Sequence, residues 1–149
     1  MSLDLKDNII KNTRALICKQ ENNKVLFLLT KEDSGSITIP GGCKDLEDAD
    51  LKVALQRELQ EELGLYPDDY SLKDVGVQKE YDNLYNGNPD SERFGKKTII
   101  YMYVISDLKK EPIPSAEIKG ISWYTKEEAL NSFNRPHMKE LFELALKTI

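Results

Sequence analysis

The sequence of 149 residues predicts an α/β fold from three observations. Short aliphatic and β-branched segments separated by polar turns fill the first third, one helix with an acidic side follows, and a second group of strands precedes a closing amphipathic helix. Strands and helices in this order are typical of a sheet with helices packed on it. Because no repeat, low-complexity tract or linker interrupts the chain, we expect residues 1–149 to form a single domain.

The first strands are predicted at 13–18 and 25–30, which are rich in aliphatic and β-branched residues. The polar segment 20–23 between them indicates a hairpin turn. A short strand at 37–39 then leads into the turn Pro40-Gly41-Gly42.

A helix is predicted from about Asp50, because apolar residues recur at helical spacing and form one stripe. These residues are Leu51, Ala54, Leu55, Leu59 and Leu63. Gly64 is expected to cap the helix and Pro67 to block its continuation. We therefore expect the helix to dock by its apolar edge.

The second half of the chain predicts longer strands, since 98–105 is continuously apolar, as in a strand covered on both faces. Pro136 suits the first turn of a closing helix. The expected elements are strands at 72–81, 98–106 and 119–124, a polar loop at 82–95, and helices at 126–130 and 136–147.

The composition bounds the function. A net charge of −5 argues against general nucleic-acid binding or binding to an anionic membrane, because both rely on positive charge. It leaves a nucleotide substrate open, since a metal and a few local cations can reverse the field in one cleft.

The amino terminus carries acids where a secretory signal needs basic residues, and the longest apolar run, 25–29, is too short to span a bilayer. Cys18 and Cys43 have no CxxC pair or His cluster near them, so we interpret both as free thiols. We therefore expect a cytoplasmic protein.

The predicted helix gathers three carboxylates on one arc. Glu58, Glu61 and Glu62 fall within about 100° of each other, and like charges at this spacing destabilise a helix unless a cation lies between them. Arg57 alone cannot neutralise all three. A solvated acidic face is the alternative, but a hard divalent cation such as Mg²⁺, which prefers oxygen ligands, suits the pattern better.

The stretch from Pro40 to Leu65 resembles the Nudix box, the signature of the Nudix hydrolases. That pattern is Gly, five residues, Glu, seven residues, and then Arg-Glu-apolar-x-Glu-Glu-x-Gly-apolar. Every fixed position from Arg57 to Leu65 matches. The resemblance implies a Nudix-type α/β/α sandwich, with a mixed sheet and a central acidic catalytic helix.

The first half of the box departs from the pattern. Asp48 stands where the family has Glu, and eight residues rather than seven separate it from Arg57. An added residue inside the helix would rotate the glutamates by about 100°, so we expect it in the loop or first turn near 46–50. The resemblance implies an orienting role for Asp48, and we predict that it pairs with Arg57.

The resemblance also implies a metal site. Glu58 and Glu62 would be the most direct ligands, Glu61 would join them directly or through water, and the Gly41 carbonyl would complete the site. The expected cofactor is Mg²⁺, which Mn²⁺ can replace.

Two further roles follow from the resemblance. Arg57, Glu58 and Glu61 would belong to the catalytic machinery, with Arg57 holding the helix in register. Glu117 would be a base or extra ligand outside the box, in a segment up to Trp123 that is similar to the asymmetrical diadenosine tetraphosphate hydrolases; a solvated loop carboxylate is the alternative.

Substrate contacts are expected around the loop before the apolar strand 98–105. Cations there would contact phosphates and aromatic side chains would stack on a base. The candidates are Arg93, Lys96, Lys97, Tyr81, Tyr85 and Phe94. An exposed loop with core aromatics is the competing interpretation. His137 is expected at the surface, without a catalytic role.

The leading hypothesis is an Mg²⁺-dependent pyrophosphohydrolase that cleaves a nucleoside diphosphate linked to another group. The segments 96–101 and 117–123 are most similar to those of dinucleoside tetraphosphate hydrolases, which release a nucleoside triphosphate and a monophosphate. Coenzyme A and diphosphoinositol polyphosphate diphosphatases remain alternatives. So does a non-catalytic domain that binds nucleotide or RNA. We expect a small nucleotide as partner, no membrane, and a monomer or homodimer.

Overall fold

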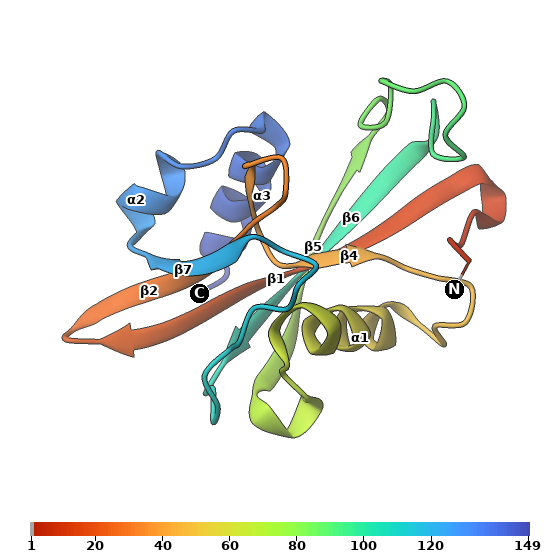
Figure 1. Ribbon diagram of the computed structural model, residues 1–149. Helices are drawn as coiled ribbons and strands as arrows, with labels where there is room; N and C mark the ends of the chain where they lie inside the picture. The colour runs from red at the N-terminus through yellow and green to blue at the C-terminus, as the bar shows by residue number, and fades with distance from the viewer. Residues whose placement is uncertain (1) are drawn as a thin grey trace.

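The computed structural model describes residues 2–149 as a mixed β-sheet with helices on both faces (Figure 1). The strands are β1 (Ile9–Glu21), β2 (Lys24–Lys31), β3 (Ile37–Thr38), β4 (Gly41–Cys43), β5 (Ser71–Tyr81), β6 (Lys97–Ser106) and β7 (Gly120–Tyr124). The helices are α1 (Leu51–Leu63), α2 (Lys126–Leu130) and α3 (Pro136–Leu146), with 3₁₀ turns η1 (Lys6–Asn8) and η2 (Pro67–Asp69). The predicted α/β sandwich is confirmed.

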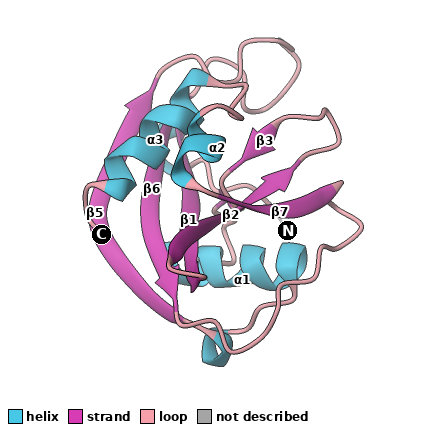
Figure 2. Ribbon diagram, turned by 90° about the vertical axis from the view of Figure 1, so that its left-hand side faces the viewer, coloured by secondary structure: helices cyan, strands magenta, loops and turns pink. Residues whose placement is uncertain are grey.

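The sheet has the order β3-β2-β1-β6-β5, with β4 also paired to β1 and β7 to β2 (Figure 2). The strands β1 and β6 are parallel, in a ladder that runs from the pair Ile9 and Lys97 to the pair Ile17 and Ile105. The other pairs are antiparallel. The sheet is therefore mixed, as expected.

The strands β1 and β2 separate at one end, and the segment 37–43 fills the fork between them. β3 pairs with β2, while β4 pairs with residues 12–14 of β1. Between them the Pro40 carbonyl accepts a hydrogen bond from Ala15 N–H at 2.8 Å. The expectation of a simple turn at Pro40-Gly41-Gly42 was therefore wrong, because pairing with β1 overrides the local turn signal.

Two apolar layers hold the sandwich together. α1 buries Leu55, Leu59 and Leu63 against one face of the sheet, in a cluster with Ile17 and Ile105. α2 and α3 cover the opposite face, where side chains such as Phe142 and Leu141 pack on Leu16 and Phe27. Figure 1 shows α1 on one side of the strands and α2 and α3 on the other. α1 is thus fixed by its apolar edge.

The ends of α1 are set by local chemistry. Asp50 caps the first turn by accepting a hydrogen bond from Val53 N–H at 2.8 Å. Gly64 ends the helix in the left-handed conformation, with φ of 65°. Because the helix begins at Leu51, Asp48 and the added residue lie in the loop before it, as expected. The glutamates therefore keep their positions on the helix.

Both cysteines are free thiols. Within residues 2–149, no helix combines the length and the apolar character that crossing a membrane requires.

We expect Gly41→Ala to lower the free energy of unfolding by at least about 3 kcal/mol, because it combines backbone strain with a clash. Gly41 has φ of +145°, and an added Cβ would overlap the Thr13 carbonyl oxygen and lie 2.8 Å from Arg14 Cα. Urea unfolding measures the loss. The control is Gly87→Ala, since a Cβ at Gly87 meets no atom within 4 Å. Equal stability of the two variants would contradict the expectation.

Candidate active site

The candidate site lies where α1 faces β4. Glu58 and Glu62 are one turn apart on the side of α1 toward the glycine strand, and both are partly buried. The Glu58 carboxylate is so close to Gly42 that a Cβ there would lie 2.5 Å from its Cδ. Gly41 N–H donates a weak hydrogen bond to Glu62 Oε1 at 3.3 Å. The two glycines therefore allow the carboxylates to approach the backbone of β4.

Arg57 joins α1 to the preceding loop. Its Nε and Nη2 donate to Oδ1 and Oδ2 of Asp48, both at 3.0 Å, and Nη2 lies 3.3 Å from an Asp45 carboxylate oxygen. Nη2 also donates to the Cys43 carbonyl of β4 at 3.1 Å. The predicted pairing of Asp48 with Arg57 is thus present, in a bidentate form.

Asp48 is almost fully buried, so its charge depends on this pair. Burial acts to raise the pKa of Asp48, but the hydrogen bonds from Arg57 outweigh it and hold the pKa below its usual range. The pKa of Arg57 is raised by the same contacts. The pair therefore stays ionised.

Arg57 also neutralises part of the acidic arc. Its Nη1 lies 3.1 Å from Glu58 Oε1 and 3.2 Å from Glu61 Oε2. Glu61 is the more exposed of these two carboxylates. Glu62 has no cation at ion-pair distance among the described residues and keeps only its hydrogen bond from Gly41.

Burial leaves negative charge on α1 that is poorly compensated. Desolvation raises the pKa of Glu58, and repulsion from Glu61 adds to it. For Glu62, desolvation raises the pKa to about 7, with further contributions from the charges of Glu58 and Glu117. Since charge is disfavoured at both positions, a cation placed there would relieve the repulsion.

These residues fit a hard divalent cation. The available donors are oxygens, as Mg²⁺ and Mn²⁺ prefer, and Glu62 is a partly buried carboxylate that lacks a cation partner in the described chain. No three acidic, His or Cys side chains in residues 2–149 are gathered into a ready cluster. The reason is that Arg57 engages Glu58 and Glu61.

Glu117 lies near the same end of α1, although it is distant in sequence. Its loop docks on the helix, because Ser115 N–H donates to the Glu62 carbonyl at 2.9 Å and Ile113 N–H to the Leu63 carbonyl at 2.9 Å. The carboxylate of Glu117 is exposed, and its charge contributes to the raised pKa of Glu62. The structure thus brings Glu117 toward the box glutamates.

A cavity of about 410 Å³ opens beside Glu58. It contains Arg93 and Tyr85, two of the expected substrate-binding residues, and Arg93 Cζ lies 5.4 Å from the centre of the Tyr85 ring. The complete lining is Asn12, Arg14, Glu32, Gly42, Cys43, Asp45, Glu58, Tyr85, Arg93 and Arg135.

The other expected aromatic residues lie outside this cavity. Tyr81 donates to Glu140 on α3 at 2.7 Å and packs its ring 5.5 Å from that of His137. Phe94 is exposed on its loop. His137 is partly buried rather than on the surface, because the Tyr81 ring covers it.

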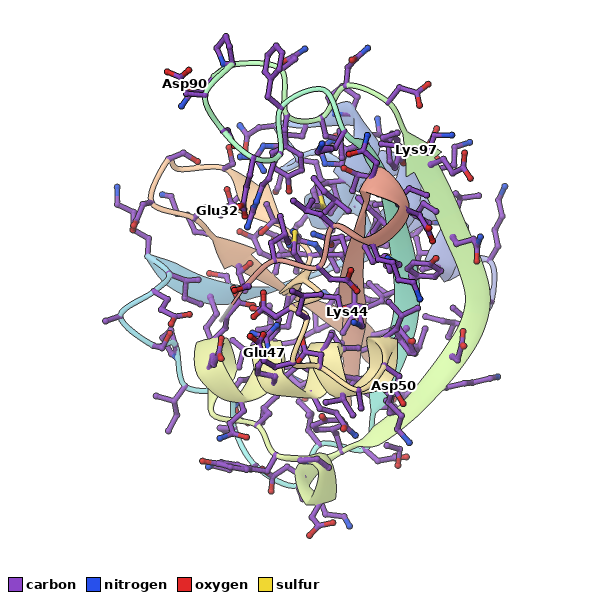
Figure 3. The ribbon with its side chains drawn as sticks, turned by 90° about the vertical axis from the view of Figure 1, so that its right-hand side faces the viewer. Glu32, Lys44, Glu47, Asp50, Asp90 and Lys97 are labelled. Carbon is purple, nitrogen blue, oxygen red and sulfur yellow. The ribbon has the colours of Figure 1, made fainter. Side chains whose placement is uncertain are left out.

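The two expected lysines also lie elsewhere. Lys96 donates to Asn8 at 2.5 Å, and Lys97 pairs with Glu80 at 3.5 Å. In Figure 3, Lys97 stands at the start of β6, well above α1, whereas Glu32 lies between α1 and the loop that carries Asp90. Neither lysine lines the cavity beside Glu58.

Sequence reasoning missed five charged or amide residues of this cavity: Asn12, Arg14, Glu32, Asp45 and Arg135. Arg14 gave a signal, since it is a charged residue inside a strand that is otherwise aliphatic. Arg135 and Glu32 gave none, because only the fold brings the start of α3 beside the end of β2.

The sequence profile of the NUDIX domain matches residues 10–145. A search of curated protein sequences found no match. The fold is similar to the Ap4A hydrolase of C. elegans in a binary complex, with a TM-score of 0.73, 18% identity, and coverage of 93% of this chain and 96% of that one.

Two other solved structures are similar. The dihydroneopterin triphosphate pyrophosphohydrolase of E. coli has a TM-score of 0.73 at 12% identity, with 93% of this chain and 96% of that chain covered. The NUDIX domain of Shewanella oneidensis NrtR, complexed with ADP ribose, has a TM-score of 0.66 at 16% identity, with 92% and 88% covered. At such identities these structures show a shared fold.

We expect Gly42→Ala to reduce turnover by about 10²-fold, the scale of losing one preorganised electrostatic element. The added Cβ would lie 2.5–2.7 Å from the atoms of the Glu58 carboxylate and displace it. Since Glu58 is flexible, the unfolding free energy should change by less than about 1 kcal/mol. Steady-state kinetics and urea unfolding measure both, with Gly87→Ala as control. Normal turnover, or a stability loss as large as that of Gly41→Ala, would contradict this.

We expect Asp48→Asn to lower the unfolding free energy at pH 7 by about 2–3 kcal/mol, because it removes charge-assisted hydrogen bonds. The folded pKa of Asp48 lies below the unfolded value, so this stabilisation is complete above the unfolded pKa and is lost as pH falls through the folded pKa. The gap between wild type and variant should therefore close in acid below about pH 4.

Urea unfolding at a series of pH values measures this gap. Asp90→Asn is the control, since Asp90 is exposed and its carboxylate makes no ion pair in the described structure. A gap for Asp48→Asn that does not depend on pH would argue against the ionic pair.

Proposed function

Because the chain belongs to the NUDIX family and is a Nudix hydrolase, we propose that it cleaves a phosphoric anhydride bond with Mg²⁺, which Mn²⁺ can replace. The observation that supports this proposal is the pair of partly buried glutamates, Glu58 and Glu62, packed against Gly41 and Gly42 beside a polar cavity. Nudix hydrolases generally use a divalent metal.

In this proposal, Glu58, Glu62 and the Gly41 carbonyl would hold the metal, with Glu61 joining directly or through water. When bound, the metal supplies polarisation of a phosphate oxygen and neutralises charge that develops on the leaving phosphate. The side chains of the protein bind the substrate and hold the reacting groups in position.

Arg57 is a positioning residue. By binding Asp48 and Asp45 it fixes α1 relative to the loop and to β4. Its Nη1 also orients Glu58 and Glu61. Glu117, exposed and near Glu62, is our candidate for accepting the proton of the attacking water on a carboxylate oxygen.

The substrate we propose is a dinucleoside tetraphosphate, cleaved to a nucleoside triphosphate and a monophosphate. This choice rests on the resemblance of 96–101 and 117–123 to enzymes of that type. The fold is similar to that of an Ap4A hydrolase, but it is equally similar to that of a dihydroneopterin triphosphate pyrophosphohydrolase. Coenzyme A and diphosphoinositol polyphosphate remain the alternative substrates.

A non-catalytic nucleotide- or RNA-binding domain is the alternative of another class. Against it stands the retention of Glu58, Glu61 and Glu62, which repel one another and gain nothing in a site without a cation. We further propose a small nucleotide as partner, a cytoplasmic location, and a monomer or homodimer.

We expect hydrolysis of diadenosine tetraphosphate to yield ATP and AMP and to stop in EDTA. Glu62→Gln should lower turnover by at least ~10²-fold, as when a key electrostatic group is lost. It should not lower stability, because burial already disfavours the Glu62 charge. Chromatography identifies the products and measures the turnover on diadenosine tetraphosphate and on a panel of ADP-ribose, coenzyme A, nucleoside triphosphates and a diphosphoinositol polyphosphate. Urea unfolding measures the stability.

Glu143→Gln on α3 is the matched control, since Glu143 is exposed and far from β4 in the sandwich. Two ADP molecules as products, or a faster rate on another member of the panel, would reject the tetraphosphate assignment alone. Full activity in EDTA would reject the metal-dependent reaction.

A further inference from the structure

The arginines of this chain are confined to one place. The sequence has four arginines and seventeen lysines. Arg14, Arg93 and Arg135 line the cavity beside Glu58, and the fourth, Arg57, contacts the Glu58 carboxylate. No lysine lines this cavity in the part of the chain that the structure describes. A planar guanidinium matches phosphate oxygens by bidentate hydrogen bonds, which an ammonium group cannot do.

The three arginines come from separate parts of the fold. Arg14 lies on β1, Arg93 on the loop between β5 and β6, and Arg135 just before α3. A second cavity of about 290 Å³ shares Asn12, Arg14, Tyr85 and Arg135 with the first, so the two cavities adjoin.

Arg14 is held with one edge free. Its Nε donates to Asn12 Oδ1 at 2.8 Å, and its Nη1 donates to the Ile39 carbonyl at 2.9 Å. Nη2 takes part in neither bond. The guanidinium is therefore fixed by neighbouring strands while one nitrogen remains for a bound anion.

The cavity lining contains three arginines and three acids, and these arginines differ in their ion pairs. Glu32 pairs with Arg135 at 2.9 Å, while Asp45 and Glu58 share Arg57 with Asp48 and Glu61. Neither Arg14 nor Arg93 forms an ion pair with a carboxylate among the described residues. Two guanidinium groups are thus left to neutralise an anion that enters the cavity.

The lining suits phosphate better than a nucleobase. Tyr85 is the main aromatic side chain, and Arg93 already lies over its ring at 5.4 Å. The smaller cavity adds one aromatic ring, that of His137, which packs on Tyr81, and the apolar side chains of Leu84, Ile100 and Met138. No pair of free aromatic faces is offered for stacking within the described lining.

We propose that Arg14, Arg93 and Arg135 form a subsite for the phosphates that lie beyond the cleaved bond. The substrate then carries three or more phosphates, as in a nucleoside polyphosphate, rather than the two of ADP-ribose. The position of this subsite relative to the cleaved bond rests on the proposed function. The binding of a phosphate anion by the arginines does not. Arg14 and Arg93 supply guanidinium groups that form no ion pair with a carboxylate in the described structure, and Arg135, paired with Glu32, adds a third.

The first test is binding without turnover. Calorimetry of the metal-free protein with inorganic tripolyphosphate at low salt should show binding that weakens about tenfold in Arg14→Gln and in Arg93→Gln, the effect of losing one charge-assisted hydrogen bond. Arg14→Lys should not restore tripolyphosphate binding, because an ammonium group lacks the planar pair of donors of a guanidinium. Lys139→Gln removes one charge from the exposed side of α3 and should leave binding within twofold. Arg93→Gln keeps the test valid if Arg14 variants fold poorly.

The second test compares long and short substrates. In Arg93→Gln, kcat/KM for diadenosine tetraphosphate should fall about tenfold, while that for ADP-ribose should change less than twofold. The same kcat/KM measurement with a diphosphoinositol polyphosphate shows whether hydrolysis of a nucleotide or of an inositol phosphate depends more on Arg93. Equal losses on long and short substrates, or equal loss of tripolyphosphate binding in Lys139→Gln, would overturn the subsite.

The two proposals fail in different ways. If wild type hydrolyses nothing but binds tripolyphosphate through Arg14 and Arg93, the proposed function fails and the subsite stands. If wild type hydrolyses the tetraphosphate and the arginine variants behave like wild type in both assays, the subsite fails and the proposed function stands.

Discussion

The geometry of the site depends on the guanidinium group of Arg57. It contacts four carboxylates and the Cys43 carbonyl, and so ties together α1, the loop before it and β4. The buried apolar stripe of α1 packs on the sheet, on a different side of the helix from Arg57. Polar contacts therefore hold α1 to the loop and to β4 at this site. Because Asp48 is almost fully buried, breaking this ion pair would leave an uncompensated buried charge in the loop.

The cleft also brings acids and arginines together from different elements. On one side, carboxylates of α1 lie against the glycines of β4. Because glycine has no side chain, the carboxylates can approach the backbone of that strand. On the other side, arginines from β1, the 82–96 loop and the start of α3 face the same space. Arg57 alone lies between the two groups. A net charge of −5 therefore coexists with a concentration of guanidinium groups, because the arginines are gathered around one cavity.

Local patterns predicted the fold well and the cleft only in part. The apolar period of α1, its Gly64 cap and the apolar β6 are encoded by neighbouring residues, and the structure agrees with them. The pairing of Asp48 with Arg57 was predicted from the resemblance, despite the irregular spacing, and it is present in the structure. Lys96 and Lys97, which were expected in the substrate site, do not line the cavity beside Glu58, and their partners, Asn8 and Glu80, are neighbours only in the folded sheet. Arg135 was missed for the same reason.

The parallel pairing of β1 with β6 has a consequence for the order in which the protein folds. Ile9 can find Lys97 only after most of the chain has been made, whereas the β1–β2 hairpin closes locally. Until then, the edge of β1 that will receive β6 is left without hydrogen-bond partners, and such non-local pairing is slow because loop entropy is lost first. During synthesis on the ribosome, the early strands must therefore wait with an exposed edge, which is the state in which this chain is most open to association with other unfinished chains.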